Sequence, residues 1–260
     1  MTYSKLERFH HIINQLQEKQ KISVVDIAEQ LEVAPETIRR DLGELEEQKR
    51  VTRVHGGAIP FLNLRKEPQF KRKMDMQKEA KQKIAKVAAS RIEDGDTIGL
   101  DVGTTTLYLA DYLYGIQNLT VVTNSIAAAE RFNLALEEGR ITGKVFLLGG
   151  FTNPAQSSVA GPITVDWLEK MNLDKAFLSC GGIKDGTVFD YDMDESLVSS
   201  KMIERSNCRM LLADATKIEQ QSFYSICAME ELTEILCDEP CPKAWAEYQQ
   251  LWTVVEGGTE

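Results

Sequence analysis

The sequence predicts an α/β chain in which a small N-terminal domain of the winged helix-turn-helix type precedes a larger domain built on a mostly parallel sheet. Apolar residues at helical spacing fill the first 48 positions, and short apolar runs alternate with helical segments after position 77. Strands that alternate with helices indicate a parallel sheet covered on both faces. The 260 residues also exceed one average domain. We therefore divide the chain into a first domain at 1–59, a linker at 60–77 and a second domain at 78–260.

Charge is distributed unevenly between these parts. The whole chain has a net charge of −10, which by itself argues against binding a polyanion. Residues 1–75, however, contain 14 Lys and Arg against 12 Asp and Glu, whereas residues 76–260 contain 16 against 28. The acidic excess therefore lies in the second part, and the first part remains able to present a basic face to nucleic acid.

Composition also suggests a compartment. No apolar run approaches the roughly 18–20 residues of a membrane span, and the first residues lack the apolar stretch of a secretory signal. The five cysteines include no C-x-x-C pair, which favours free thiols in a reducing compartment. We expect a cytoplasmic protein without membrane contact, metal site or cofactor.

The first domain shows the parts of a helix-turn-helix. Residues 5–19 have helical spacing, and Ser23 with Asp26 three positions later fits a capping box at the start of a second helix. Pro35 suits the first turn of a third helix. Residues 50–55 then alternate in polarity before the turn at Gly56-Gly57, which predicts a short strand pair.

The third helix would expose a face suited to DNA. In a helix-turn-helix this helix lies in the major groove, where arginine can pair with guanine or with phosphate. An exposed arginine pair can equally be ordinary solvated surface, so spacing alone leaves both interpretations open. The candidate DNA contacts, including the strand pair as a wing, are Ser23, Glu36, Thr37, Arg39, Arg40, Arg53 and His55.

The second domain should contain seven short buried strands. They are expected at Thr97–Val102, Leu119–Thr123, Lys144–Leu148, Asp174–Cys180, Cys208–Ala213, Glu234–Cys237 and Leu251–Val255. The first strand runs into Gly103-Thr104-Thr105-Thr106 and a helix, an arrangement that offers backbone N–H groups to an anion. Small polar residues also follow later strands at 123–125, 149–150 and 180–182. Each loop alone can be an ordinary turn. Together they favour a ligand site at the carboxyl edge of the sheet.

Two segments resemble the DeoR family of bacterial regulators. Thr37-Ile38-Arg39-Arg40-Asp41-Leu42 matches that family's T-I-R-R-D-L signature, and Arg53 to Ala58 matches its R-x-x-G-G-A ending. Its sensor-domain motifs D-x-G-T-T, T-N-S, G-G and D-x-(S/T)-K are also present, the last at Asp214–Lys217. The resemblance implies a winged helix-turn-helix repressor of sugar or nucleoside genes. Its sensor domain would resemble ribose-5-phosphate isomerase and bind a phosphorylated sugar.

The resemblance also implies roles for particular residues. Gly103, Thr104 and Thr105 would hold phosphate, and Lys217 would supply positive charge. The remaining candidate effector contacts, most of them facing the sugar, are Asp101, Thr123, Asn124, Gly149, Gly150, Asp190 and Glu195.

Two positions depart from the family pattern. Ala34 replaces the serine that commonly caps the recognition helix, and loss of such a cap costs about 1 kcal/mol. Ser199 stands where a lysine usually follows Glu195 by four residues, and the nearest lysine is Lys201. A shift of two residues turns a helical side chain by about 200°, so Lys201 should not replace the missing lysine.

These observations predict a repressor that binds operator DNA as a homodimer or tetramer and responds to a phosphorylated sugar. One alternative is an isomerase-like enzyme in which Asp101, Asp190, Glu195 and Lys217 move protons. Another is a constitutive DNA binder whose effector pocket has decayed, an interpretation that Ser199 keeps open. A turnover assay tests the first alternative, and thermal shifts with phosphosugars test the second.

Overall fold

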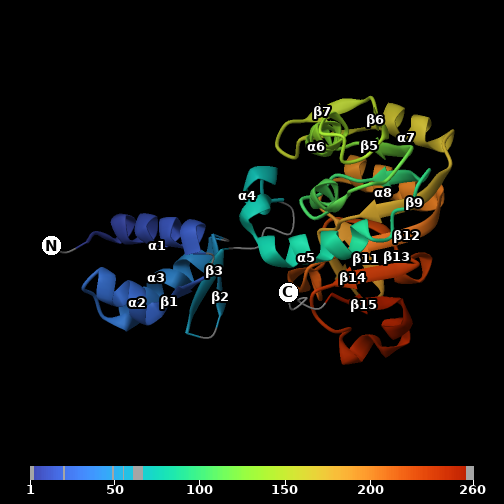
Figure 1. Ribbon diagram of the computed structural model, residues 1–260. Coiled ribbons are helices and arrows are strands. Elements are labelled where there is room, and N and C mark those ends of the chain that lie inside the picture. The colour runs from blue at the N-terminus through green and yellow to red at the C-terminus, as the bar shows by residue number, and fades with distance from the viewer. Residues whose placement is uncertain (1–2, 20, 49, 55, 61–66, 256–260) are drawn as a thin grey trace. The chain divides into compact units, whose positions relative to one another are not determined.

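A computed structural model describes residues 3–19, 21–48, 50–54, 56–60 and 67–255. The chain forms two compact units, Met1–Lys66 and Glu67–Glu260 (Figure 1). The predicted linker at 60–77 is therefore shorter in the structure, because residues 67–77 pack as part of the second unit. A separate short helix, Phe70–Asp75, precedes the helix predicted from Lys78, and the extended Met76 and left-handed Gln77 divide the two.

The first unit is a winged helix-turn-helix. Its elements are α1 (Lys5–Lys19), β1 (Ile22–Ser23), α2 (Val24–Gln30), α3 (Pro35–Glu47), β2 (Val51–Val54) and β3 (Gly57–Pro60). The three predicted helices and the strand pair are confirmed, since β2 and β3 pair as an antiparallel hairpin. The pairing of β1 with β3 was not predicted, because a two-residue strand carries no periodicity. Gly57 permits it: a Cβ there would lie 1.8 Å from the carbonyl oxygen of Ile22.

The second unit begins with α4 (Phe70–Asp75) and α5 (Lys78–Ala89). Its other elements, with η for 3₁₀ helices, are β4 (Thr97–Leu100), η1 (Thr106–Tyr112), β5 (Leu119–Thr123), α6 (Ile126–Glu137), β6 (Gly143–Leu147), β7 (Phe151–Asn153), β8 (Ser158–Ala160), α7 (Pro162–Glu169), β9 (Leu173–Leu178), β10 (Gly182–Lys184), β11 (Thr187–Asp190), α8 (Met193–Glu204), β12 (Ser206–Leu212), η2 (Ala215–Lys217), β13 (Tyr224–Ala228), η3 (Met229–Glu231), β14 (Glu234–Cys237), η4 (Lys243–Leu251) and β15 (Trp252–Val254).

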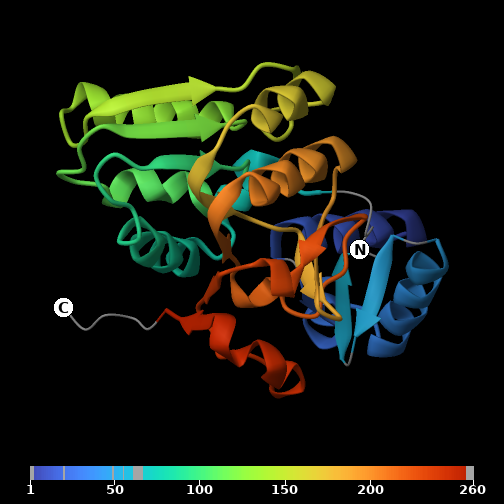
Figure 2. The ribbon, with the colours of Figure 1, turned by 90° about the vertical axis from the view of Figure 1, so that its right-hand side faces the viewer.

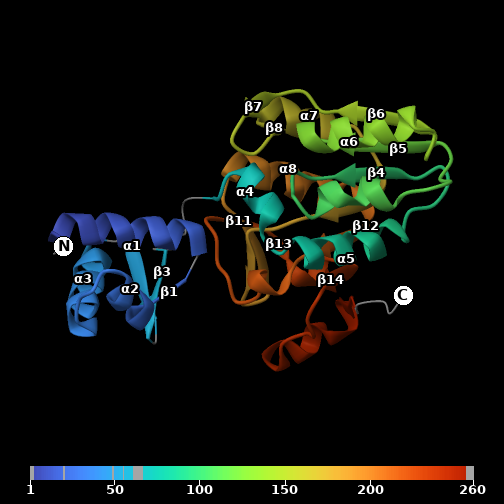
Figure 3. The same ribbon diagram turned by 60° about the vertical axis from the view of Figure 1, so that its left-hand side comes forward.

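The main sheet has seven strands in the order β15-β14-β12-β9-β4-β5-β6, and every neighbouring pair is parallel. These are the seven strands predicted from the sequence. Alternating side chains enter two separate cores, as a sheet buried on both faces requires. Phe177 packs with α5, η1 and α6, whereas Ala176 and Leu178 pack with α7 and α8 on the other face. Helices cover both faces of the sheet (Figures 2 and 3).

Smaller antiparallel pieces were not predicted. They are the β7–β8 hairpin and the three-stranded sheet β10-β11-β13. Strands of three to five residues are too short for their alternation to be read, and their pairing depends on long-range contacts. The helices predicted around 105–114 and 242–250 are 3₁₀ helices. Within the described part of the chain, no helix has both the length and the hydropathy to cross a membrane.

Candidate DNA-binding and effector sites

Helix α3 presents the predicted basic face. Arg39 and Arg40 are exposed, while Ile38, Leu42 and Leu45 are buried in the core of the first unit. Arg39 Nη1 pairs with Glu36 Oε2 at 2.9 Å, and both side chains are more than half exposed. Such a surface ion pair contributes little, so Arg39 can exchange it for a base or a phosphate.

A buried ion pair sets the orientation of α3. Arg8 on α1 donates two hydrogen bonds to Asp41 on α3, from Nε to Oδ2 at 2.6 Å and from Nη2 to Oδ1 at 3.0 Å. The Asp41 side chain is only 3% exposed. Because a bidentate pair fixes direction as well as distance, it holds the helix that carries Arg39 and Arg40.

The remaining candidate DNA contacts are placed as follows. Thr37 is half-buried near the start of α3, and Arg53 is exposed on the wing, with its guanidinium beside Gly43. Ser23 Oγ accepts hydrogen bonds from the N–H groups of Val25 and Asp26, so it caps α2 as predicted. His55 lies outside the described residues.

The missing cap at Ala34 is visible in the structure. Ala34 has the extended backbone of an N-cap residue, and its side chain makes no capping hydrogen bond. We expect Ala34→Ser to stabilise α3 by about 1 kcal/mol, because a hydroxyl would accept a free N–H of the first turn. Hydrogen exchange of α3 amides in the full chain measures this. Ala34→Val, which cannot accept a hydrogen bond, is the control. Equal exchange in the two variants would contradict the expectation.

The candidate effector site lies at the carboxyl edge of the main sheet, with Asp101 at its centre. Asp101 follows β4 and is fully buried. Its Oδ1 accepts hydrogen bonds from Ser179 N at 3.0 Å and Oγ at 3.3 Å, and its Oδ2 accepts one from Ser199 Oγ at 3.0 Å. Burial raises the pKa of the Asp101 carboxyl well above its usual range. Asp101 therefore joins the ends of two strands, β4 and β9, to helix α8 at the base of the site.

The Gly103–Thr105 loop, which comes shortly after Asp101 in the chain, packs closely against Ser179. A Cβ on Gly103 would lie 2.1 Å from Ser179 Oγ, so only glycine fits there. The first hydrogen bonds of η1 run from Leu107 to Gly103 and from Tyr108 to Thr105. The backbone N–H groups of Thr104 and Thr105 lie before these first hydrogen bonds of η1. An anion can therefore accept hydrogen bonds from them.

Asn124 offers a polar group that the protein leaves unused. It follows β5, is fully buried, and has no partner among the described residues for either Nδ2 or Oδ1. Gln156 is similar: its Nε2 donates to Pro68 O at 3.1 Å, and its buried Oε1 is unpaired within the described part of the chain. A buried polar group without a partner costs about 1–3 kcal/mol, which a ligand with hydroxyl groups would recover.

Three lysines from separate elements supply positive charge. They are Lys73 on α4, Lys81 on α5 and Lys217 on η2. Burial is the main reason that the pKa of Lys81 falls to about 8; the charges of Lys217 and Lys73 lower it further, against the opposing effect of Asp214. An anion beside these ammonium groups would relieve their mutual repulsion.

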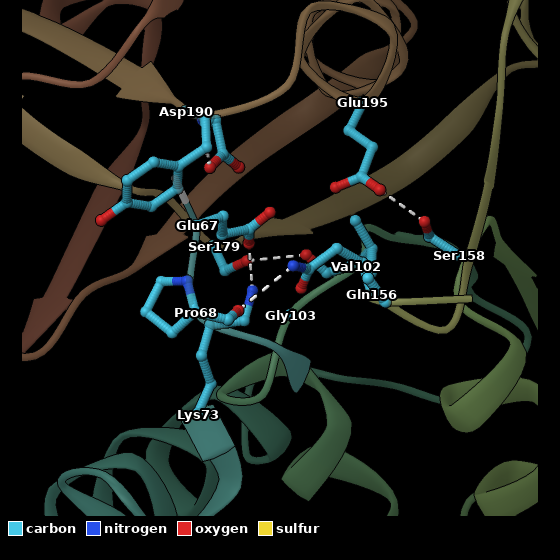
Figure 4. A network of polar contacts seen from close by, with 12 residues as sticks. Glu67, Pro68, Lys73, Val102, Gly103, Gln156, Ser158, Ser179, Asp190 and Glu195 are labelled. Atoms are coloured by element: carbon cyan, nitrogen blue, oxygen red, sulfur yellow. Dashed lines mark hydrogen bonds and ion pairs between the residues drawn. The ribbon is translucent and has the colours of Figure 1, made fainter. Parts of the chain in front are cut away.

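Carboxyl groups line the opposite side. Asp190 is the last residue of β11, and Glu195 lies in the first turn of α8. Glu195 Oε1 accepts hydrogen bonds from Asn153 and Ser158, which ties the β7–β8 hairpin to α8. Burial raises the pKa of both Asp190 and Glu195. Figure 4 shows their carboxyl groups on two sides of the space that also contains Glu67.

Positions 199 and 201 point in different directions, as expected from the helical rotation between them. Ser199 faces Asp101, whereas Lys201 points elsewhere and pairs with Glu204. The rotation predicted for Lys201 is therefore confirmed. A lysine at 199 would have neutralised Asp101, and serine only donates a hydrogen bond to it.

Other predicted residues have mainly structural contacts. Thr123 Oγ1 donates to Leu100 O at 2.7 Å and accepts from Ser125 N, so it joins the ends of β4 and β5. Gly149 and Gly150 pack against Thr164 of α7. Gly149 O accepts a hydrogen bond from Thr164 Oγ1, and a Cβ on Gly150 would lie 2.3 Å from Thr164 Oγ1. Gly149 and Gly150 therefore contact α7 and β8.

Five further residues of the site were not predicted from the sequence: Glu67, Lys73, Lys81, Gln156 and Ser179. Most of them are far from the strand ends in sequence, so no local pattern marks them. Lys81 did carry a signal. It lies on the same face of α5 as the buried residues Ile84, Ala85 and Ala88. Lysine is rarely buried unless it has a partner, so its position on an apolar face indicates a polar or charged partner.

A winged helix-turn-helix unit, followed by an α/β unit with an anion-compatible polar site, defines the class of DNA-binding regulators with a sensor domain. Two family models match this division: a DeoR-like helix-turn-helix domain at residues 8–61 and a DeoR C-terminal sensor domain at residues 76–239. The chain belongs to the DeoR family of transcriptional regulators.

Several proteins are similar along most of their length. An uncharacterized HTH-type transcriptional regulator of Staphylococcus epidermidis is 40% identical over 215 residues, which cover 83% of this chain and 84% of that one. The lactose phosphotransferase system repressor of Staphylococcus aureus is 34% identical, covering 90% and 92%. An uncharacterized HTH-type transcriptional regulator of Bacillus subtilis, FruR, is 33% identical, covering 89% and 90%. Among solved structures, ribose 5-phosphate isomerase A of Neisseria gonorrhoeae is 16% identical, with a TM-score of 0.39, covering 55% of this chain and 54% of that chain.

Proposed function

We propose that the protein is a sequence-specific repressor of carbohydrate-utilisation genes, and that a phosphorylated sugar bound at the carboxyl edge of the sheet controls it. Support for the gene class comes from the relative named as a lactose phosphotransferase system repressor. The observation that carries the ligand class is the side-chain amide of Asn124 at the end of β5, which is buried and has no partner among the described residues. The charges of Lys73, Lys81 and Lys217 also act on one another. The amide suits sugar hydroxyls, and the lysines suit phosphate.

Control of DNA binding follows from linkage. If the ligand binds one arrangement of the protein better than another, DNA affinity changes by the same coupling free energy, typically about 1–3 kcal/mol. The first unit contributes one recognition helix, so a two-fold operator needs two copies of the chain.

We therefore propose a homo-oligomer, a dimer or a tetramer. Exposed apolar side chains on edge strand β6 and its neighbours β7 and α7 suit contact between copies; they are Phe146, Leu147, Phe151, Ile163 and Trp167. The mass of the DNA complex by light scattering tests this, and one chain per operator would refute it.

The site supports binding rather than catalysis. Both oxygens of Asp101 accept hydrogen bonds from protein groups, and Glu195 is engaged by Asn153 and Ser158. A general base must be able to reach a proton of the substrate, which these contacts oppose. We propose that the protein has no isomerase activity, and turnover of pentose or hexose phosphates above background would refute this.

The function is tested by binding to the promoter DNA beside the protein's own gene, with and without a panel of aldose and ketose phosphates. We expect specific binding that one compound changes. Arg39→Ala should weaken operator binding by about 1–3 kcal/mol if it contacts a base. Thr104→Asp should abolish the response through like-charge repulsion and leave DNA binding intact. A normal response in Thr104→Asp would refute the anion site, and DNA binding that ignores every compound would indicate a decayed pocket.

A further inference from the structure

The segment Glu67–Lys73 is the start of the second unit, and hydrogen bonds along its length hold it to the candidate effector site. Phe70 N donates to Ala155 O at 2.9 Å, and Gln156 Nε2 donates to Pro68 O at 3.1 Å. The Lys81 ammonium donates to Lys73 O at 2.6 Å. We call Glu67–Lys73 the anchor segment. In sequence, the anchor segment begins directly after the first unit, which ends at Lys66.

The Glu67 carboxylate lies inside the site rather than in solvent. It forms an ion pair with Lys73, and the two side chains are only 12% and 16% exposed. Burial raises the pKa of Glu67 to about 7; Lys73 opposes this rise, and Asp190 and Glu195 add to it. Figure 4 shows Glu67 in the space between Lys73 and the carboxyl groups of Asp190 and Glu195.

This placement makes Glu67 a rival of any anionic ligand. Lys73 is one of the three lysines that suit a phosphate, and in the structure it is paired with Glu67. A phosphate that approaches these lysines meets a carboxylate of like charge at one of them. It can pair with Lys73 only if Glu67 withdraws or becomes neutral.

We propose that Glu67 is a built-in competitor of the effector: it holds Lys73 in the free protein, and a bound phosphorylated ligand displaces it. Displacement loosens the anchor segment, which follows the first unit directly in sequence. Ligand binding thereby acts on the part of the second unit that is nearest in sequence to the DNA-binding unit. The inference rests on the proposed function, because it requires an anionic effector in this site.

The test compares wild-type protein with Glu67→Gln, which keeps the shape of the side chain and removes its charge. Sulfate is the first probe, because its charge does not change near neutral pH. Glu67 is mostly charged near pH 8 and mostly neutral near pH 6, as its pKa of about 7 requires. We therefore expect Glu67→Gln to bind sulfate on the order of tenfold more tightly near pH 8 and about equally near pH 6.

Two further variants keep the result interpretable. Glu79→Gln removes an exposed carboxylate at the start of α5 and should leave sulfate affinity unchanged. Lys73→Gln removes the contested cation and should weaken sulfate binding at both pH values. The same variants are then measured with the sugar phosphate that the promoter experiment selects.

Hydrogen exchange of the anchor segment measures whether an anion displaces Glu67 from Lys73. Near pH 8, sulfate should speed exchange of the Phe70 amide in wild-type protein, and Glu67→Gln should show the faster exchange without any anion. If wild-type protein binds sulfate and Glu67→Gln gains no affinity, Glu67 is not a competitor, although the anion site stands. If neither protein binds sulfate or any sugar phosphate, the anion site and the inference both fall.

Discussion

Arg8→Ala is expected to destabilise the DNA-binding unit by about 3 kcal/mol, because it leaves the buried Asp41 carboxylate without its partner. The Arg8 side chain is 14% exposed and donates two hydrogen bonds to Asp41. Loss of the pair also frees α3 to change its orientation, so operator affinity should fall even though Arg8 lies on α1. Hydrogen exchange of α3 amides in the full chain, together with operator binding, measures both effects.

Lys5→Ala provides a matched control for Arg8→Ala. Lys5 also lies on α1 and pairs with a carboxylate of α3, Glu44, but the two side chains are 55% and 35% exposed. An exposed pair contributes about 0–1 kcal/mol, so this variant should change little. Similar small effects of the two variants would show that burial of Asp41 does not set the orientation of α3.

Asn124→Ala is expected to lower affinity for the sugar phosphate at least about tenfold while leaving the unliganded protein as stable as wild type, or nearly so. The Asn124 amide is buried, and within the part of the chain that the structure describes it makes no hydrogen bond that alanine would lose. Removing a buried polar group without a partner also removes its desolvation cost. Affinity is measured by calorimetry with the selected sugar phosphate, and stability by thermal unfolding.

The neighbouring Ser125 should behave in the opposite way. Ser125 Oγ accepts a hydrogen bond from Ala128 N and caps α6. Ser125→Ala should therefore cost about 1 kcal/mol of stability and change ligand affinity little. If Asn124→Ala destabilised the free protein as much as Ser125→Ala and left ligand affinity unchanged, the Asn124 amide would be structural and not a ligand contact.

Much of the site could be anticipated where it follows directly from strand ends. Asp101, Asn124 and Lys217 come just after β4, β5 and β12, and parallel strands bring their carboxyl ends to one edge. Glu67, Lys73 and Gln156 could not be found in this way. They belong to the anchor segment and the β7–β8 loop, and their places depend on contacts such as that between Gln156 and Pro68.

The sequence by itself determined the two-domain architecture, the seven strands of the main sheet and the exposed arginines of α3, because these depend on local periodicity and on which face of an element is apolar. Only the tertiary structure decided which charged and polar side chains that are distant in sequence form pairs. It paired Arg8 with buried Asp41, placed Ser199 against Asp101, and brought Glu67 to Lys73 beside Asp190. Such pairings depend on burial and on distance in space, which no local pattern encodes.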